Sequence, residues 1–253
     1  MDFNTSTACV VIPARYKSSR FPGKPLVILN GKPMILWVAD RAALAVGIDN
    51  VYIATDDDRI ANVVSQAGYK FIMTESELLT GTDRVARASE NLNYTIIINL
   101  QGDEPMVDPD DIKNCIKTKL NNLDKVINGF TIISDEEKKE SINIPKVLFN
   151  EQGDLVYLSR NIIPGLKDNS FGPEKYYKQV CIYAYTKEEL SKFYSFGRKS
   201  IIENFEDIEI LRFLELDIKI KMIFCKGGSL AVDTPEDVKV VERALNNNNN
   251  CVI

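Results

Sequence analysis

"VVIPARYKSSRFPGKPL", residues 10–26, combines an apolar segment with a cationic one. It begins as an apolar run typical of a buried strand and changes directly into a loop rich in cations. Those cations are Arg15, Lys17, Arg20 and Lys24. A phosphate group needs such cations together with backbone N–H groups that can point at its oxygens. Gly23 allows close approach of the backbone and the neighbouring prolines limit loop entropy, so the stretch indicates a phosphate site after the first strand.

The known glycine-rich phosphate motifs are absent from this loop. Gly23 and Lys24 are followed by Pro25, and no glycine precedes them by five residues, so the pattern is not GxxxxGK[ST]. GxGxxG is missing as well. A solvated basic loop is the alternative interpretation. The position of the cations at the carboxyl end of a strand favours phosphate.

Length and composition restrict the classes of protein. At 253 residues the chain can form one α/β domain, or one domain with a small lobe. A net charge of −5 argues against a general nucleic-acid or membrane surface, and no apolar run is long enough to span a bilayer. No basic segment followed by a long apolar stretch opens the sequence, so we expect a cytoplasmic protein.

The cysteines and histidines exclude several chemistries. The 5 cysteines have no metal-binding spacing, and we expect them to be reduced thiols. The chain has 0 histidines, which excludes Ser-His-Asp hydrolysis, histidine zinc sites and histidine general bases. Any chemistry must use carboxylates, cations, a metal or the backbone.

Strands and helices alternate through the first half of the chain. Hydrophobic periodicity predicts strands over 8–14, 50–56, 69–73 and 94–100, and helices over 33–46, 57–68 and 80–92. Each strand ends in a polar loop. Because ligands bind at the carboxyl ends of strands in open α/β sheets, we expect these loops to converge on one site.

The second half is less regular. Residues 146–160 predict a hairpin that turns at 150–153, and 178–186 predict a strand followed by acidic helical segments. Residues 229–245 predict a strand and then a helix, with Thr234 as N-cap, Pro235 in the first helical position and Asp237 two residues later. The asparagine run in 246–253 predicts a disordered tail.

Carboxylates follow two of the predicted strands. Asp103 and Glu104 lie in "NLQGDEPMVDP", residues 99–109, and Asp233 lies in "AVDTPED", residues 231–237. Carboxylates at this edge can hold magnesium bound to a nucleotide's phosphates. A capping turn is the alternative for both, and it is the stronger alternative for Asp233, because the sequence there starts a helix well.

Two further motifs are ambiguous. "LLTGTDRVA", residues 78–86, places Thr80, Gly81, Thr82 and Arg84 at a helix start, which suits an anion or a base edge as well as ordinary capping. "TDDDR", residues 55–59, can bind metal, but three aspartates before a helix are more often a cap and solvated charge.

Taken together the motifs are recognisable. "VIPARYKSSRFPGKPL", "NGKPMI", "ATDDDRI", "TGTDRVARA", "NLQGDEPMVDP", "YLSR" and "VDTPED" closely resemble the 3-deoxy-manno-octulosonate (Kdo) cytidylyltransferases, in that family's order, over roughly residues 8–245. The resemblance implies an α/β, glycosyltransferase-A-like nucleotidyltransferase fold, with a mixed central sheet flanked by helices and a smaller dimerisation and sugar-binding lobe. It also implies a homodimer that transfers CMP from CTP to the anomeric hydroxyl of a 3-deoxy eight-carbon sugar acid for lipopolysaccharide synthesis, with Mg²⁺ as cofactor.

The resemblance also divides the chain. It implies a single nucleotidyltransferase domain over 1–245. Residues 8–135 are expected mainly to bind the nucleotide, and about 136–228 to bind the sugar and form the dimer. Residues 229–245 are expected to return to the core.

The resemblance assigns roles to individual residues. It implies catalytic roles for Arg15, Lys24 and Asp103, and magnesium ligands at Asp103 and Asp233. It places the nucleotide at Pro13, Ala14, Arg15, Lys24, Thr80, Gly81, Arg84 and Gln101. It places the sugar at Arg84, Gln101, Arg160, Gln179, Tyr183, Glu209 and Ile210, with Arg160 meeting the sugar carboxylate.

The sugar-side motifs depart from the family pattern. Gln179 stands where the family has histidine, Cys181 where it has glycine, and Ile210 where it has glutamine. The nucleotide and metal motifs are intact. These changes predict a different preference at the tail of the sugar. The alternatives are a cytidylyltransferase for another sugar acid, such as a modified Kdo or a sialic-acid type, and a non-catalytic nucleotide-binding homologue.

Overall fold

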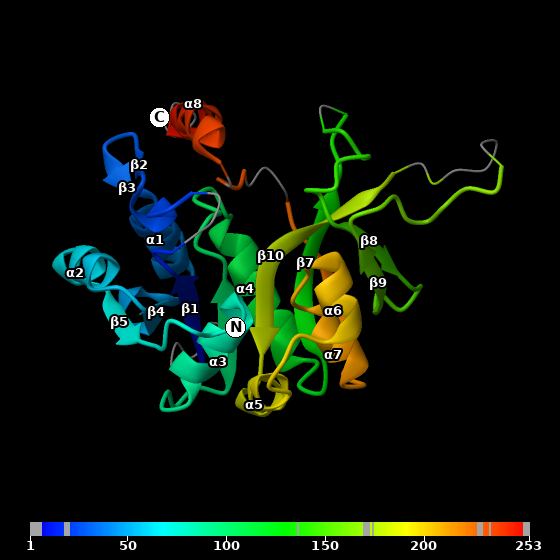
Figure 1. Ribbon diagram of the computed structural model, residues 1–253, viewed down its shortest axis with the longest axis horizontal. Helices are drawn as coiled ribbons and strands as arrows, with labels where there is room; N and C mark the ends of the chain where they lie inside the picture. The colour runs from blue at the N-terminus through cyan, green and yellow to red at the C-terminus, as the bar shows by residue number, and fades with distance from the viewer. Residues whose placement is uncertain are drawn as a thin grey trace.

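A nine-stranded mixed sheet forms the centre of the computed structural model, with helices on both faces (Figure 1). The structure describes residues 7–17, 21–135, 137–168, 173, 175–226, 230–232 and 234–249. The strands of the sheet are β1 (Ala8–Ala14), β4 (Val51–Thr55), β5 (Lys70–Met73), β6 (Ile96–Leu100), β7 (Val126–Ile132), β8 (Lys146–Phe149), β9 (Leu155–Ser159), β10 (Tyr177–Tyr185) and β11 (Ile220–Phe224). A separate small pair joins β2 (Ile28–Leu29) to β3 (Lys32–Pro33).

The helices of the described residues connect these strands. They are α1 (Met34–Val46), α2 (Asp58–Gln66), α3 (Gly81–Ser89), α4 (Pro109–Leu120), α5 (Lys187–Ser195), α6 (Ile201–Glu206), α7 (Leu211–Glu215) and α8 (Pro235–Asn249), with short 3-10 helices η1 (Lys24–Leu26) and η2 (Ile48–Asn50). Within these residues, none of the helices combines the length and apolarity needed to cross a bilayer.

The directions of the strands bring several loops to the same edge of the sheet. The main order is β11-β7-β10-β6-β1-β4-β5, and β1 pairs in parallel with both β4 and β6. β10 runs antiparallel to β6 and β7, so its amino-terminal end lies beside their carboxyl-terminal ends. The loops after β1, β4 and β6 and the start of β10 therefore share one edge of the sheet, as expected for a ligand site.

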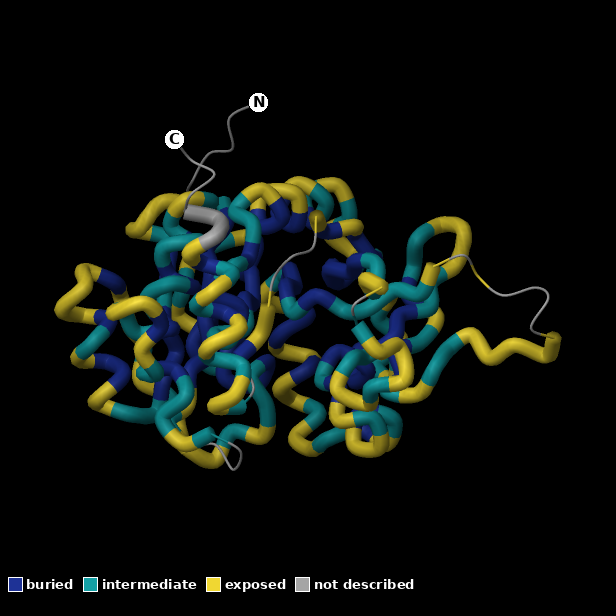
Figure 2. Tube along the Cα trace, turned by 90° about the horizontal axis from the view of Figure 1, so that it is seen from above, coloured by how far each residue is buried: buried dark blue, intermediate teal, exposed yellow. Residues whose placement is uncertain are grey.

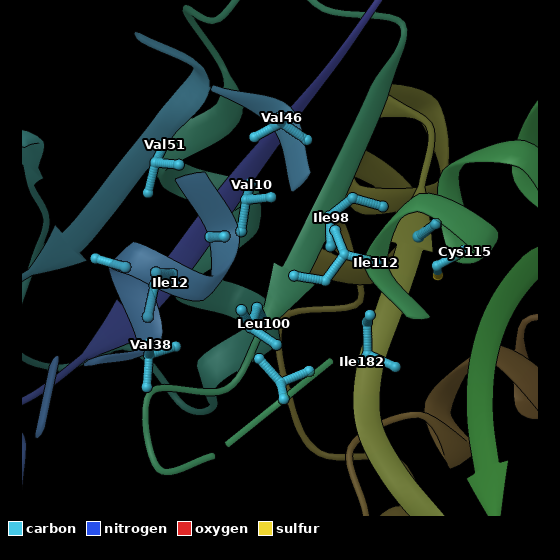
Figure 3. Packing of buried hydrophobic residues seen from close by; sticks show 14 of the residues in the cluster. Val10, Ile12, Val38, Val46, Val51, Ile98, Leu100, Ile112, Cys115 and Ile182 are labelled. Atoms are coloured by element: carbon cyan, nitrogen blue, oxygen red, sulfur yellow. The ribbon is translucent and has the colours of Figure 1, made fainter. Parts of the chain in front are cut away.

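The core has two main layers, one on each face of the sheet. Val10 and Ile12 of β1 pack with α1, α2 and α4 on one face, and the labelled residues of this cluster interdigitate in Figure 3. Cys9 and Val11 pack on the other face with α3, α5 and α7. All seven residues of β1 are buried, which explains its continuous apolar sequence. Figure 2 shows buried residues, in dark blue, concentrated in the interior of the body.

Most of the sequence-based elements are confirmed. The strands predicted over 8–14, 50–56, 69–73, 94–100 and 178–186 correspond to β1, β4, β5, β6 and β10, and the three predicted helices to α1, α2 and α3. The hairpin is β8–β9, and its turn is closed by the Gly153 N–H, which donates to the Asn150 carbonyl at 2.8 Å.

The carboxyl-terminal part differs from the prediction. Residues 230–232 form no strand, and the strand in this region is β11, which the sequence analysis missed together with β7 and α4. The Val232 N–H donates to the Asp103 carbonyl at 3.0 Å. Helix α8 begins at Pro235 as predicted, but it continues through Asn249, four residues into the segment expected to be disordered. α8 lies beside β2 and β3 (Figure 1), where Asn30 Nδ2 donates to Asn246 Oδ1 at 3.0 Å.

Candidate active site

Two cavities lie at the shared edge of the sheet and have a common wall. The first, which we name the β1 cavity, has a volume of about 320 Å³ and adjoins the loop after β1. The second, the β10 cavity, has a volume of about 370 Å³ and adjoins the start of β10. The residues that line both, which we name the shared wall, are Gln101, Asp103, Arg160, Asp207 and Glu209. Two ligands could therefore meet at this wall.

The β1 cavity gathers every residue predicted to bind the nucleotide. These lining residues are Pro13, Ala14, Arg15, Lys24, Thr80, Gly81, Arg84 and Gln101. They come from three separate stretches of the chain, which the parallel strands β1 and β6 and the start of α3 bring together. The placement agrees with the predicted convergence, while the role of each residue stays a prediction.

A glycine shapes the loop after β1. Gly23 has φ of 74°, in the left-handed region that favours glycine, and its N–H donates to the Tyr16 carbonyl at 2.9 Å. A Cβ at Gly23 would lie 3.2 Å from the Tyr16 ring, so a larger residue would push the ring or the loop. The Arg59 guanidinium carbon also lies over this ring, 3.3 Å from its centroid. This turn places Lys24 at the start of η1.

Lys24 and Asp103 form an ion pair across the β1 cavity. Lys24 Nζ lies 2.8 Å from Asp103 Oδ2, and the two side chains are 18% and 27% exposed. Each therefore holds the other in place while both remain accessible from the cavity. The predicted catalytic cation and the predicted metal ligand thus meet in the structure.

Arg84 reaches the β1 cavity from inside the protein. Its side chain is 3% exposed, lies 3.4 Å from Asp56 Oδ2, and donates to Thr74 Oγ1. Burial lowers the pKa of Arg84, Asp56 raises it, and the charge of nearby Arg15 lowers it again. Two guanidinium groups close enough to repel each other favour an anion between or beside them.

The amino terminus of α3 is occupied by a side chain of the same protein. Glu209 accepts from the Gly81 N–H at 3.0 Å and from the Thr82 N–H at 2.8 Å, and also from the Thr82 hydroxyl at 2.7 Å. Thr80, rather than Thr82, is the N-cap, and its Oγ1 accepts from the Asp83 N–H. The helix start therefore uses its donors internally, and Glu209 fixes α3 against the segment before α7.

A buried charge network strengthens the same connection. Arg212 is 0% exposed and lies 2.9 Å from Asp83 and 2.7 Å from Glu203. It joins α3, which lines the β1 cavity, to α6 and α7, whose flanking segments carry the lining residues Lys199, Asp207 and Glu209.

Replacing Arg212 with methionine should destabilise the protein strongly. The change leaves Asp83 and Glu203 buried without their cation, which costs about 3–5 kcal/mol of unfolding free energy and lowers Tm by at least about 6 °C. Thermal unfolding followed by circular dichroism measures it. Arg87→Met, which removes two exposed ion pairs of α3, is the control and should cost less than about 1 kcal/mol. Equal, small shifts for the two variants would contradict the proposed importance of the network.

Arg160 stands in the shared wall as a cation held by neutral partners. Its guanidinium donates to the backbone carbonyls of Glu206, Ile142 and Asp207, the last two at 2.9 and 3.0 Å. Its side chain has no carboxylate within ion-pair distance among the described residues. Because the carbonyl partners are neutral, the charge of the Arg160 guanidinium is not cancelled and remains available to a bound anion. The guanidinium has five N–H groups, so some remain for such a ligand.

Gln179 and Tyr183 line the β10 cavity near a β-bulge. The register of β10 against β7 shifts between Val180 and Tyr183, which re-aims the side chains at this point. Gln179 Nε2 donates to Asn128 Oδ1 at 3.1 Å and lies 3.3 Å from the Tyr183 hydroxyl. The Gln179 amide is therefore part of a polar network in the cavity wall.

Ile210 is placed differently from the other predicted sugar residues. It is 1% exposed and packs in the hydrophobic layer beside α7, and it is not among the described residues that line either cavity. Because the Ile210 side chain is apolar, it packs in the core, where a polar side chain would need a hydrogen-bond partner. A direct contact of Ile210 with the sugar stays a prediction.

The predicted magnesium site is described only in part. Asp103 offers an accessible carboxylate in the shared wall, and hard oxygen ligands of this kind suit Mg²⁺. Asp233 lies outside the described residues. Over the part of the chain that the structure describes, no group of three or more histidine, cysteine, aspartate or glutamate side chains is arranged to hold a metal ion. Magnesium commonly completes its shell with substrate phosphates and water, so a single protein carboxylate fits.

Two charged residues of the site were missed by the sequence analysis. Lys199 lines the β1 cavity and Asp207 lines both cavities, with Lys199 Nζ 2.7 Å from Asp207 Oδ1. They flank α6, in a stretch for which the sequence predicted only acidic helical segments. No strand end or motif marks them, so only the folding of α6 against the shared wall could reveal them.

Comparisons with known proteins agree with this geometry. The family model for cytidylyltransferases matches residues 9–220. An 8-amino-3,8-dideoxy-manno-octulosonate cytidylyltransferase of Shewanella baltica (strain OS155) is 41% identical over 244 residues, which cover 93% of this chain and 97% of that protein.

Solved structures give the same result for the fold. CMP:2-keto-3-deoxy-manno-octonic acid synthetase complexed with CTP matches with a TM-score of 0.88 and 36% identity, covering 96% of this chain and 100% of that chain. A cytidylyltransferase from Leptospira borgpetersenii matches at 0.63 and 16% identity over 93% and 85% of the two chains, which shows the fold alone. The predicted nucleotidyltransferase fold is thus confirmed. With the family model over most of its length and a full-length relative above 40% identity, the chain belongs to the cytidylyltransferase family, as an enzyme of the 3-deoxy-manno-octulosonate cytidylyltransferase type.

Proposed function

We propose that this enzyme transfers CMP from CTP to the anomeric hydroxyl of a 3-deoxy eight-carbon sugar acid and releases pyrophosphate. The observation that carries the proposal is the shared wall between the two cavities. The β1 cavity holds Arg15, Lys24 and Arg84 for a triphosphate, and the β10 cavity begins at Arg160, a cation suited to a carboxylate. A nucleotide in one cavity and a sugar acid in the other would meet at the wall.

The cations of the β1 cavity would bind and orient the triphosphate. Arg84 is held by burial and by Asp56, so it presents its charge without reorganisation. Arg15 and Lys24 are more accessible and would follow the phosphate oxygens as pyrophosphate leaves. Fixed charges aimed at developing negative charge, together with alignment of the reacting groups, account for most catalysis in phosphoryl transfer.

Asp103 is the proposed magnesium ligand, together with Asp233. When bound, magnesium supplies neutralisation of the triphosphate and lowers the pKa of a coordinated hydroxyl, which removes the need for a histidine base. Lys24 keeps Asp103 oriented toward the cavities at 2.8 Å. Gln101, also in the shared wall, donates to Asn99 Oδ1 at 3.4 Å and would position the sugar beside the α-phosphate.

Arg160 would bind the carboxylate of the sugar acid, and the β10 cavity would contact the opposite end of the sugar. That cavity is lined by more carboxylates than cations. Asp103, Asp108, Glu137 and Asp207 are paired with lysines, and Glu104, Asp111 and Glu209 add further negative charge. A negative lining favours a sugar that carries an ammonium group away from its carboxylate. Since relatives at 41% identity are named for the 8-amino sugar, we propose 8-amino-3,8-dideoxy-manno-octulosonate as the preferred acceptor.

A competition assay tests this choice. With CTP and equal amounts of Kdo and the 8-amino sugar acid, the mass of the CMP-sugar product should show a preference for the amino sugar of at least about 10-fold, as expected when one charged contact is satisfied or left unpaired. Gln179→His should shift the ratio toward Kdo, because a partly protonated imidazole adds positive charge to the cavity.

Two results would count against the proposed acceptor. A preference for Kdo by the unchanged enzyme would assign it the unmodified sugar. A ratio that Gln179→His leaves unaltered would remove Gln179 from sugar selection. Ile210 is left unchanged in this assay, because a glutamine placed in the core would lose stability for reasons unrelated to the sugar.

The biological setting remains part of the proposal. A homodimer, a cytoplasmic location and a role in lipopolysaccharide synthesis follow from the family resemblance and from the motifs quoted above.

A further inference from the structure

Lys199 is a charged residue of the β1 cavity that neither the motifs nor the proposed mechanism uses. It lies between α5 and α6, far in sequence from the cationic loop, and its side chain is 33% exposed. Its Nζ lies 2.7 Å from Asp207 Oδ1, and the Asp207 side chain is 72% exposed. A lysine that lines a cavity while paired with an exposed carboxylate can exchange that partner for a ligand.

The ion pair is weak enough to open. Pairs this exposed contribute about 0–1 kcal/mol, because water screens the charges and two side chains must be ordered. Asp207 is held independently, since its carbonyl accepts from Arg160 Nη2 at 3.0 Å. Losing Lys199 would therefore leave the Asp207 backbone, and with it the guanidinium of Arg160, in place.

The charges of the β1 cavity favour an anionic ligand for Lys199. Among the described lining residues the cations are Arg15, Lys24, Arg84, Arg160 and Lys199, and the carboxylates are Asp103, Asp207 and Glu209. Glu209 already accepts from three donors of α3, and Asp103 is paired with Lys24. The remaining positive charge of the cavity favours a ligand with several negatively charged oxygens.

Position distinguishes a phosphate from the sugar carboxylate. Asp207 lines both cavities, whereas Lys199 is among the described lining residues of the β1 cavity and not of the β10 cavity. Its ammonium is a compact charge on a flexible stem, which suits phosphate oxygens that move as a reaction proceeds. Lys199 also comes from the segment between α5 and α6, a different part of the chain from the loop of Arg15 and Lys24, so it adds a separate contact for the triphosphate.

We propose that Lys199 binds the triphosphate of CTP, exchanging the Asp207 carboxylate for a phosphate oxygen when the nucleotide enters. The inference rests on the proposed function, because it assumes that CTP occupies the β1 cavity. Asp207 then acts as a resting partner that keeps the ammonium at the cavity wall and competes with the nucleotide.

Calorimetric titration of CTP in the presence of magnesium and without any sugar tests the inference. Lys199→Gln should raise the Kd for CTP about 10-fold, the loss expected for one hydrogen bond to a charged group. The control is Lys192→Gln, which removes an exposed lysine paired with Glu188 on α5 and should leave Kd within about 2-fold. Asp207→Asn should tighten CTP binding, because it frees Lys199 and removes a competing negative charge.

The outcomes separate this inference from its alternatives. If Lys199→Gln binds CTP like the Lys192 control, Lys199 does not contact the nucleotide. If Asp207→Asn weakens CTP binding as much as Lys199→Gln does, the ion pair is a structural clasp and the inference is overturned. A raised KM for the sugar acid with unchanged CTP binding would assign Lys199 to the carboxylate instead. Failure of the unchanged protein to bind CTP would overturn the proposed function itself.

Discussion

Replacing Asp103 with asparagine should lower kcat/KM for CTP by at least about 100-fold, the loss typical of a main electrostatic contributor to a reaction. The change keeps the size of the side chain but removes the charge that would hold magnesium and that pairs with Lys24 at 2.8 Å. Pyrophosphate release at saturating magnesium measures the effect, and an unchanged Tm shows that the fold is intact.

The matched control for this prediction is Asp110→Asn. Asp110 is also a carboxylate paired with a lysine, Lys226, but it is 62% exposed and is not among the described residues that line either cavity. Its replacement should change kcat/KM less than about 2-fold, as for other exposed ion pairs. Near-normal turnover by Asp103→Asn would show that this carboxylate does not hold the metal.

Replacing Arg160 with lysine should raise the KM for the sugar acid by about 10–100-fold while leaving the Kd for CTP within about 3-fold. Lysine keeps the charge but has no planar guanidinium. It cannot donate to the same three carbonyls and at the same time offer N–H groups to a carboxylate in the cavity. Steady-state kinetics with the sugar varied, combined with CTP titration, separates the two effects.

The control for Arg160 is Arg87→Lys, an exposed arginine of α3 that should leave both constants unchanged. Equal losses of sugar and CTP binding by Arg160→Lys would indicate that Arg160 maintains the structure of the shared wall. An unchanged KM for the sugar acid would show that Arg160 does not bind its carboxylate.

The first half of the fold follows from local sequence. β1, β4 and β6 are apolar runs that end in polar loops, and the period of α1, α2 and α3 is clear because each helix covers only one face of the sheet. The insertion of β10 between β6 and β7 is non-local, and no local pattern specifies it. β7 was missed for a related reason, because "VINGFTI" contains a glycine and an asparagine.

That glycine and asparagine are explained by the tertiary structure. A Cβ at Gly129 would lie 2.7 Å from Ile182, so the close approach of β10 requires glycine there. Asn128 is buried and donates to the carbonyls of Val180 and Ile182 at 3.0 and 3.1 Å, which satisfies the backbone of the bulged strand. Both residues read as turn formers when taken alone.

The candidate site was predictable where residues follow strand ends. Arg15, Lys24 and Asp103 meet because the parallel strands β1 and β6 bring their carboxyl ends to one edge. The use of Glu209 as a partner for the α3 donors could not be inferred, because the two lie 128 residues apart in sequence. Lys199 and Asp207 were unpredictable for the same reason.

The most direct test of the account is the identity of the products formed from CTP and a 3-deoxy eight-carbon sugar acid with magnesium. Mass spectrometry should find a conjugate of CMP with the sugar acid, together with an equal amount of pyrophosphate. A sugar acid in which hydrogen replaces the anomeric hydroxyl should give neither product, since it lacks the attacking group. Pyrophosphate release without a CMP-sugar, or no turnover of CTP with either the amino sugar or Kdo, would contradict the claim that the two cavities join these substrates at their shared wall.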